Sequence, residues 1–94
     1  MTKSVSFNVA YDARTDVLYI TARREPSSRG IEDSHGIVWR YGENGDLIGA
    51  TVVDFVEIWS DNDEGLATEL ASHFDIPQPQ ALNVVRHALE GHLD

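Results

Sequence analysis

The chain has 94 residues, of which 41% are hydrophobic and 24% are charged, a composition typical of one globular domain with one modest core. Sixteen Asp and Glu residues outnumber seven Lys and Arg residues, and the resulting net charge of -9 disfavours non-specific binding to a phosphate backbone. The absence of cysteine excludes disulfides, thiolate nucleophiles and thiolate metal sites.

The sequence carries no signal for export or for membrane insertion. Residues 1–7 contain neither a continuous apolar run nor a cleavage-site pattern, so no signal peptide is expected. No apolar stretch approaches the length that crosses a bilayer. Because cysteine is also absent, we expect a cytoplasmic protein that has no membrane partner.

The N-terminal quarter predicts a β-hairpin. Apolar residues alternate with more polar ones at Val5, Phe7, Val9 and Tyr11, which is the period of a half-buried strand. Residues 12–16 predict a turn, because Asp and Thr side chains can bond nearby backbone groups. Residues 17–22 are rich in β-branched and aromatic side chains and predict the second strand.

A second hairpin is expected after a loose connection over residues 23–35. That connection holds three of the seven basic residues, Arg23, Arg24 and Arg29. Residues 36–41 predict the third strand, and Asn44-Gly45 is a strong signal for a tight turn. The fourth strand, over residues 46–53, is apolar at nearly every position, so we expect both of its faces to be covered.

The C-terminal third has the period of helices. One apolar stripe comprises Leu66, Ala67, Leu70, Ala71 and Phe74, with Ser60 or Asp61 as the expected N-cap. Residues 75–79 break this helix, and Pro79 begins a second one with the apolar face Ala81, Leu82, Val85, Ala88, Leu89 and Leu93.

The predicted fold is therefore α+β: an antiparallel four-stranded β-meander made of two hairpins, followed by two amphipathic α-helices packed on the sheet. Residues 1–94 are expected to form a single domain. Its meander spans residues 7–58 and its helical tail spans residues 60–93.

Two motifs carry a family resemblance. The first is Tyr11-Asp12 followed by Asp16-Val17-Leu18-Tyr19-Ile20. The second is Gly36-Ile37-Val38 followed by Tyr41-Gly42-Glu43-Asn44-Gly45-Asp46-Leu47-Ile48-Gly49, with Val52-Val53-Asp54 after it. Together they resemble the bacterial domain of unknown function family 2283, over roughly residues 7–58. The chain departs from the family pattern at Gly42, where members commonly carry an acidic residue, and in its longer linker.

The resemblance implies no established activity. It does imply an antitoxin-like protein that pairs with a small, basic protein encoded by a neighbouring gene. The acidic composition of this chain suits such a partner, although acidity also simply keeps a small protein soluble.

The two hairpin turns supply the most concentrated acidic residues of the predicted sheet. In a four-stranded meander both turns fall at the same end, which would bring Asp12, Asp16, Glu43 and Asp46 together. Such a cluster offers oxygen ligands for Ca²⁺ or Mg²⁺. Turn formation alone also explains these residue types, and no known ligand spacing is matched, so no metal site is predicted.

Catalytic patterns are missing. His87 and Glu90 are three apart on a predicted helix and could share a face with Asp94, but surface groups at that spacing are far more often solvated than ligands. No Ser or Thr stands in a nucleophile elbow, and no glycine-rich phosphate loop is present. We therefore expect no catalytic residue, no cofactor and no enzymatic activity.

The two helices have the apolar spacing of a helix-turn-helix pair. In that alternative, the groove-facing residues of the second helix would be Gln80, Asn83, Arg86 and His87. The acidic first helix, the two prolines between the helices and the presence of a single Arg on that face favour an ordinary helical hairpin. Nucleic acid is therefore not the expected partner.

The two tryptophans, Trp39 and Trp59, admit two interpretations of equal weight. They either lie in the core or, with Tyr41, form an exposed aromatic patch that anchors a partner. With Arg23, Arg24 and Arg29 of the linker, they are the candidate partner-binding residues. The favoured prediction is a non-enzymatic protein-binding module. The alternatives are a self-associating homodimer and a weak DNA-binding regulator.

Overall fold

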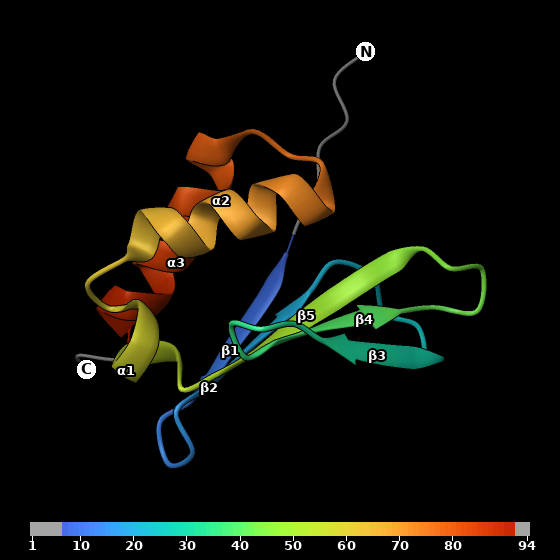
Figure 1. Cartoon of the computed structure of the whole chain (residues 1–94), viewed down its shortest axis with the longest axis horizontal. Helices are drawn as coiled ribbons and strands as arrows, with labels where there is room; N and C mark the ends of the chain where they lie inside the picture. Colours follow the sequence, from blue (N-terminus) through green and yellow to red (C-terminus); the bar gives the residue numbers. More distant parts are fainter. Residues whose placement is uncertain (1–6, 92–94) are drawn as a thin grey trace.

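A computed structural model describes residues 7–91 of the chain as an antiparallel sheet covered on one face by helices (Figure 1). The elements are, in chain order, β1 (Asn8–Asp12), β2 (Val17–Thr21), β3 (Arg29–Glu32), β4 (Ile37–Tyr41), β5 (Leu47–Val53), α1 (Phe55–Trp59), α2 (Asp63–Phe74) and α3 (Gln78–Gly91). The predicted α+β class, with an antiparallel sheet and C-terminal helices, is confirmed.

The sheet has five strands, and the prediction of a four-stranded meander was wrong. The missed strand is β3, which lies inside the segment expected to be a loose connection. Its sequence, Arg29-Gly30-Ile31-Glu32, holds a single large apolar residue, so hydrophobic periodicity gives no strand signal there. Backbone pairing with β4, from Arg29↔Tyr41 to Glu32↔Val38, makes it a strand.

The strand order is β1-β2-β5-β4-β3, and every neighbouring pair is antiparallel. The last strand along the chain, β5, therefore lies in the centre, between β2 and β4. The segment Ala22–Ser28 connects β2 to β3 by crossing over β5 and β4. It is held at both ends by hydrogen bonds, from the Ala22 amide to the Ile48 carbonyl (2.8 Å) and from the Ser28 amide to the Tyr41 carbonyl (2.8 Å).

The central position of β5 explains its nearly continuous apolar sequence. Ala50 and Val52 face the helices as part of the core, and both are almost fully buried. On the opposite face Thr51 is buried too, at 7% exposed, because it lies between its register partners Tyr19 of β2 and Val38 of β4. The Arg40 side chain also reaches it and donates a hydrogen bond to its hydroxyl. Every residue from Ile48 to Val52 is buried, as predicted, whereas Val53 at the end of the strand is 38% exposed.

The two long helices form an antiparallel hairpin over one face of the sheet (Figure 1). The α2 stripe is buried at Leu66, Ala67 and Leu70, and the α3 stripe is buried at Ala81, Val85 and Ala88. Asn62, rather than Ser60 or Asp61, caps α2, since its side chain accepts a hydrogen bond from the Gly65 amide at 3.2 Å. The predicted contribution of Val5 and Leu93 lies outside the described residues.

The short helix α1 was not predicted from the sequence. It turns the chain from the end of β5 towards α2 and buries Phe55 and Trp59 against the same core. None of the helices in the described part of the chain is both long and apolar enough to cross a membrane.

Candidate functional site

The first family motif forms a hydrogen-bonded network that joins the β1–β2 hairpin to α1. The Tyr11 hydroxyl donates to the Asp16 carboxylate at 2.7 Å, and that carboxylate also accepts from the amides of Val56 (2.9 Å) and Glu57 (3.2 Å). The Asp16 carbonyl accepts from the Phe55 amide at 3.0 Å. Asp16 thus caps α1 from a distant part of the sequence. The residue directly before the helix, Asp54, makes no side-chain cap of its own.

This network changes the acid-base properties of Tyr11. The hydrogen bond to Asp16 raises the pKa of Tyr11 to about 12, and burial and the negative charge of Asp16 and Asp12 act in the same direction. Asp12 has a local role in addition, since its carboxylate accepts from the Arg14 amide at 3.0 Å within the turn.

Three carboxylates at this end of the sheet lie close enough to share a cation. The side-chain oxygens of Asp16, Asp54 and Glu57 lie within 4.8 Å of one another. The Asp16 carboxylate already accepts hydrogen bonds from one hydroxyl and two amides, so a cation would compete with donors that position α1. Helix capping accounts for the position of Asp16 in this group.

The two acidic turns lie at opposite ends of the sheet, so the expected cluster of Asp12, Asp16, Glu43 and Asp46 does not form. The extra strand β3 is the physical reason. It adds one reversal of chain direction, so β4 runs the same way as β2 and the β4–β5 turn falls at the far end. There Asp46 pairs with Arg23 of the crossover at 3.2 Å.

Trp39 and Trp59 both lie in the core, at 2% and 4% exposed, so neither belongs to an exposed aromatic patch. Trp39 is on the sheet face that the helices cover, and its ring stacks on the His73 ring of α2 with centroids 3.7 Å apart. Its indole nitrogen donates to the Asp33 carboxylate at 3.0 Å. Among the described residues, the buried indole nitrogen of Trp59 has no hydrogen-bond partner.

The carboxylate of Asp33 organises the β3–β4 turn. It accepts hydrogen bonds from the amides of His35 (2.8 Å) and Ile37 (3.1 Å) as well as from the Trp39 indole. Burial alone would raise the pKa of Asp33, but these three hydrogen bonds and the nearby His35 ring together lower it. Asp33 is therefore ionised at neutral pH.

The remaining candidates for partner binding are the three basic residues of the crossover and of β3. Arg23, Arg24 and Arg29 are exposed, and the Arg29 guanidinium lies 5.3 Å from the centre of the half-buried Tyr41 ring. Glu25 of the crossover fills the space beside Gly42, where a Cβ atom would collide with its carboxylate.

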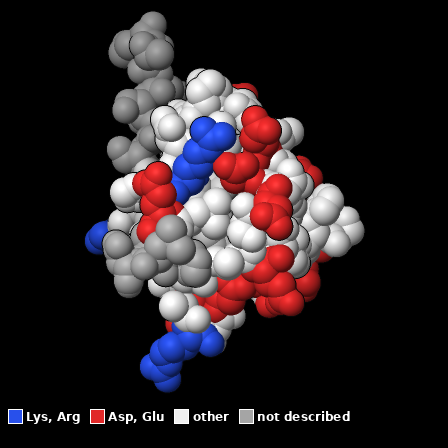
Figure 2. Space-filling model, turned by 90° about the vertical axis from the view of Figure 1, so that its left-hand side faces the viewer, with Lys and Arg blue, Asp and Glu red and all other residues white. Residues whose placement is uncertain are grey.

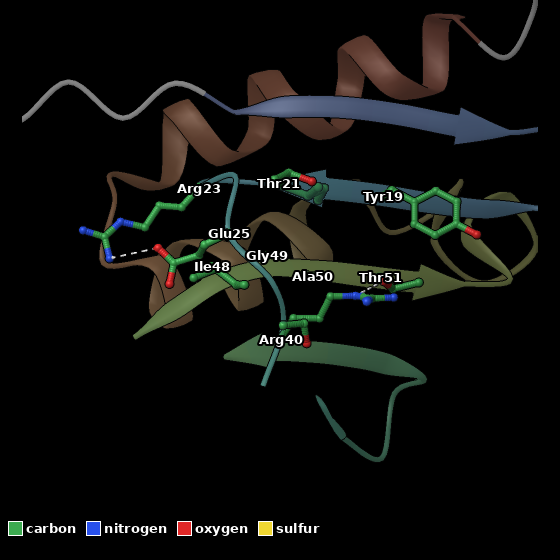
Figure 3. A pocket seen from close by; sticks show the side chains of 11 residues that line it. Tyr19, Thr21, Arg23, Glu25, Arg40, Ile48, Gly49, Ala50 and Thr51 are labelled. Atoms are coloured by element: carbon green, nitrogen blue, oxygen red, sulfur yellow. Dashed lines mark hydrogen bonds and ion pairs between the residues drawn. The ribbon is translucent and has the colours of Figure 1, made fainter. Parts of the chain in front are cut away.

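A groove of about 360 Å³ lies on the open face of the sheet beside the crossover (Figure 3). Its wall includes Glu25 of the crossover, and its floor includes Ile48 and Gly49 of β5. At one side the Arg40 Nε donates to the Thr51 hydroxyl at 2.8 Å.

The residues of the DNA-binding alternative are not assembled into a basic face. Asn83, Arg86 and His87 are exposed on α3 and Gln80 is half-buried. Arg86 is paired with the Asp63 carboxylate of α2 at 2.9 Å, and this hydrogen bond is the main cause that lowers the pKa of Asp63. The only Arg on that face is therefore neutralised within the helical hairpin.

The charges of the chain are segregated along its sequence. Residues 1–40 carry six basic and five acidic residues, whereas residues 41–94 carry one basic and eleven acidic residues, so their net charges are +1 and -10. Figure 2, which views the α1 end of the molecule, shows several groups of acidic side chains there. We define the acidic surface as Asp54, Glu57, Asp61 and Glu64, all exposed, together with Ile58, which is 48% exposed.

Comparison with known proteins identifies the family and nothing further. Neither the curated proteins nor the solved structures include a match to this chain. A family model matches residues 8–55, which comprise the five strands and the first residue of α1, while α2 and α3 lie outside the match. Tyr11, Asp16 and the β4–β5 hairpin fall inside it, whereas Val56 and Glu57, which donate to Asp16, lie just beyond it. The chain belongs to the family described as "Protein of unknown function (DUF2283)".

Proposed function

We propose that this protein is a non-enzymatic protein-binding module that docks a basic protein on the acidic surface. The observation that carries the proposal is the charge segregation: between Tyr41 and Val85 there are nine acidic residues and no Lys or Arg. A surface on which one sign of charge predominates attracts partners of the opposite sign and speeds their association.

The acidic surface also offers an apolar anchor. Ile58 is a large aliphatic side chain that remains 48% exposed on α1, one helical turn after Asp54. Apolar side chains surrounded by charged ones are typical of interfaces, where the anchor supplies affinity and the charges supply specificity. The partner chemistry that fits is a Lys- or Arg-rich segment with an apolar residue among its basic ones.

An antitoxin-like role is part of this proposal. Its support is the family resemblance together with the acidic surface, which suits neutralisation of a small, basic protein encoded by a neighbouring gene. We expect the pair to act in the cytoplasm, because a chain without cysteine has no disulfide that the reducing conditions there would break.

The test is co-expression of this chain with the small basic product of the adjacent gene, followed by purification of one partner and a binding measurement at several salt concentrations. A stoichiometric complex that weakens as salt rises is expected. The double variant Glu57→Gln/Asp61→Asn should weaken the complex at least tenfold. Adding Ile58→Ser to that double variant should weaken the complex further.

The matched control is Glu43→Gln/Asp75→Asn, which removes the same number of charges away from the acidic surface. Glu43 is in the β4–β5 turn and Asp75 follows the C-terminus of α2. Equal weakening by both double variants would show that only net charge matters, and the proposal of a defined surface would then be wrong. No complex with the neighbouring product would also reject it.

A further inference from the structure

The strand β3 forms one edge of the described sheet. Within the described residues β3 pairs only with β4, and all four of its residues are exposed. Ile31, in the middle, is 45% exposed. The opposite edge strand differs, because β1 also contacts α3. An edge that presents unpaired backbone groups and an exposed apolar side chain is a template for another strand.

The hydrogen-bond pattern shows which backbone groups of β3 face outwards. The Asp33 amide donates to the Ile37 carbonyl at 2.9 Å, which marks Asp33 and Ile37 as a hydrogen-bonded pair. In an antiparallel ladder such pairs alternate, so Ile31 is bonded to its partner Trp39 in β4. The amides and carbonyls of Gly30 and Glu32 therefore point away from the sheet.

We infer that β3 pairs with β3 of a second copy of this chain, antiparallel, with Ile31 opposite Ile31. In this register Gly30 of each copy forms a hydrogen-bonded pair with Glu32 of the other, so every outward-facing group of Gly30 and Glu32 is used. Placing Glu32 opposite Glu32 would set like charges against each other. Placing Gly30 opposite Gly30 would bond Glu32 to Ser28, whose amide already donates to Tyr41.

The side chains of β3 complement themselves in the inferred register. Ile31 meets Ile31 on the face that carries the helices, as a non-hydrogen-bonded pair whose side chains lie close together. On that same face Arg29 of each copy is opposite Asp33 of the other, which is a pair of opposite charges. Gly30 has no side chain, which leaves room on the open face for the Glu32 side chain opposite it.

Charge segregation favours a second copy at this edge over a differently charged partner. The half of the chain that contains β3, residues 1–40, has a net charge of only +1, whereas residues 41–94 carry -10. Two copies that met through their helices would repel each other strongly. Pairing through β3 brings together the nearly neutral halves and leaves both acidic surfaces exposed.

The symmetry of the pairing has a geometric consequence. A twofold axis that relates two antiparallel edge strands runs perpendicular to the sheet and keeps the faces matched. The two five-stranded sheets would become one continuous sheet with both helical layers on the same side. This inference concerns a different surface from the acidic one, so either can fail without the other.

Single-cysteine cross-linking tests the inference in the full chain, which has no cysteine of its own. In the inferred register the two Cα atoms at position 31 lie about 4.5 Å apart, within the range that a disulfide spans. The Ile31→Cys variant should therefore form a disulfide-linked dimer under mild oxidation. The two Cα atoms at position 32 would be about 8 Å apart, so Glu32→Cys should link poorly.

The matched control for exposure is Ile58→Cys, since Ile58 and Ile31 are similarly exposed, at 48% and 45%. Sedimentation equilibrium of the unmodified chain should give a mass that rises towards twice 10.5 kDa with concentration. Ile31→Lys should keep it at the monomer mass with an unchanged circular dichroism spectrum. Three outcomes would overturn the inference. These are equal cross-linking at positions 31 and 58, an unmodified chain that is strictly monomeric, and an Ile31→Lys variant that still dimerises.

Discussion

The hydroxyl of Tyr11 and the carboxylate of Asp16, five residues apart on the two sides of one turn, are joined by a hydrogen bond of 2.7 Å. The same carboxylate accepts hydrogen bonds from the amides of Val56 and Glu57 in the first turn of α1, about forty residues further along the chain. A motif that looks like ordinary turn chemistry in the sequence therefore joins two separate parts of the fold.

Replacing Asp16 should cost more stability than a turn residue normally does. Asp16→Ala removes the acceptor for three donors and puts Ala at a backbone φ of 56°, so we expect a loss of about 3 kcal/mol. Asp16→Asn, which tolerates that φ, should lose about 2 kcal/mol. Urea denaturation measures both. Asp12→Asn is the control, at about 0.5 kcal/mol or less, because Asn can also accept from the Arg14 amide.

Tyr11 should make the protein less stable at alkaline pH. Its pKa is about 12 in the folded chain and about 10 in the unfolded chain. Between these values the unfolded chain has released the proton while the folded chain keeps it, so stability falls as pH rises from about 10 to about 12 and is fully present below about 10.

The measurement is urea unfolding at a series of alkaline pH values for the natural chain and for Tyr11→Phe, with Tyr19→Phe as the matched loss of one phenol. The fall in stability above pH 10 should be shallower in Tyr11→Phe than in either of the others. An unchanged slope in Tyr11→Phe would contradict the assignment.

Trp39 should be needed for folding rather than for partner binding. Trp39→Phe deletes part of a side chain that is 2% exposed and leaves the Asp33 carboxylate without its indole donor, so a loss of about 2 kcal/mol is expected. Thermal unfolding followed by circular dichroism gives the value. Tyr19→Phe, at a residue 41% exposed, should change stability by about 0.5 kcal/mol or less. Comparable losses in the two variants would argue against the core position of Trp39.

Gly49 should not accept a side chain. A Cβ atom there would lie 2.7 Å from the Ile20 carbonyl oxygen of the neighbouring strand, so Gly49→Ala should force β2 and β5 apart at a cost of about 2 kcal/mol. The comparison is Gly45→Asn in the β4–β5 turn, where a Cβ meets nothing within 4 Å and Asn tolerates the positive φ of 82°. That variant should lose less than about 1 kcal/mol. Melting temperatures of the two variants, measured in parallel, compare their losses of stability.

Much of the fold can be predicted from the sequence, because the signals involved are local. The β1–β2 and β4–β5 hairpins follow from alternation and turn residues, and α2 and α3 follow from their apolar stripes. The strand β3 carries no such signal, since its four residues are held by pairing with β4 and not by burial. A sheet without β3 gives β4 the opposite direction, and the two acidic turns are then predicted at the same end.

The candidate surfaces were less predictable than the fold. Whether Trp39 faces the helices or solvent depends on which face α2 and α3 cover, and a strand with period two fits either choice. Asp16 was singled out, but its partners on α1 are forty residues away and leave no pattern between them. The acidic surface, by contrast, has a signal that could have been used, namely the absence of Lys and Arg between Tyr41 and Val85.

The central place of β5 sets an order in which the sheet can be assembled. The β4–β5 and β1–β2 hairpins close through short turns, whereas the nearest β2–β5 pair, Thr21↔Gly49, joins residues 28 positions apart (49 minus 21). Loop closure of that length is slower than hairpin formation. These two hairpins should therefore form first, and the β2–β5 pairing that joins them should form last. Pulse-labelling hydrogen exchange should show protection of the amides that link β4 to β5 before those that link β2 to β5. During synthesis on the ribosome, the first hairpin must wait with an unpaired inner strand until residue 53 has emerged.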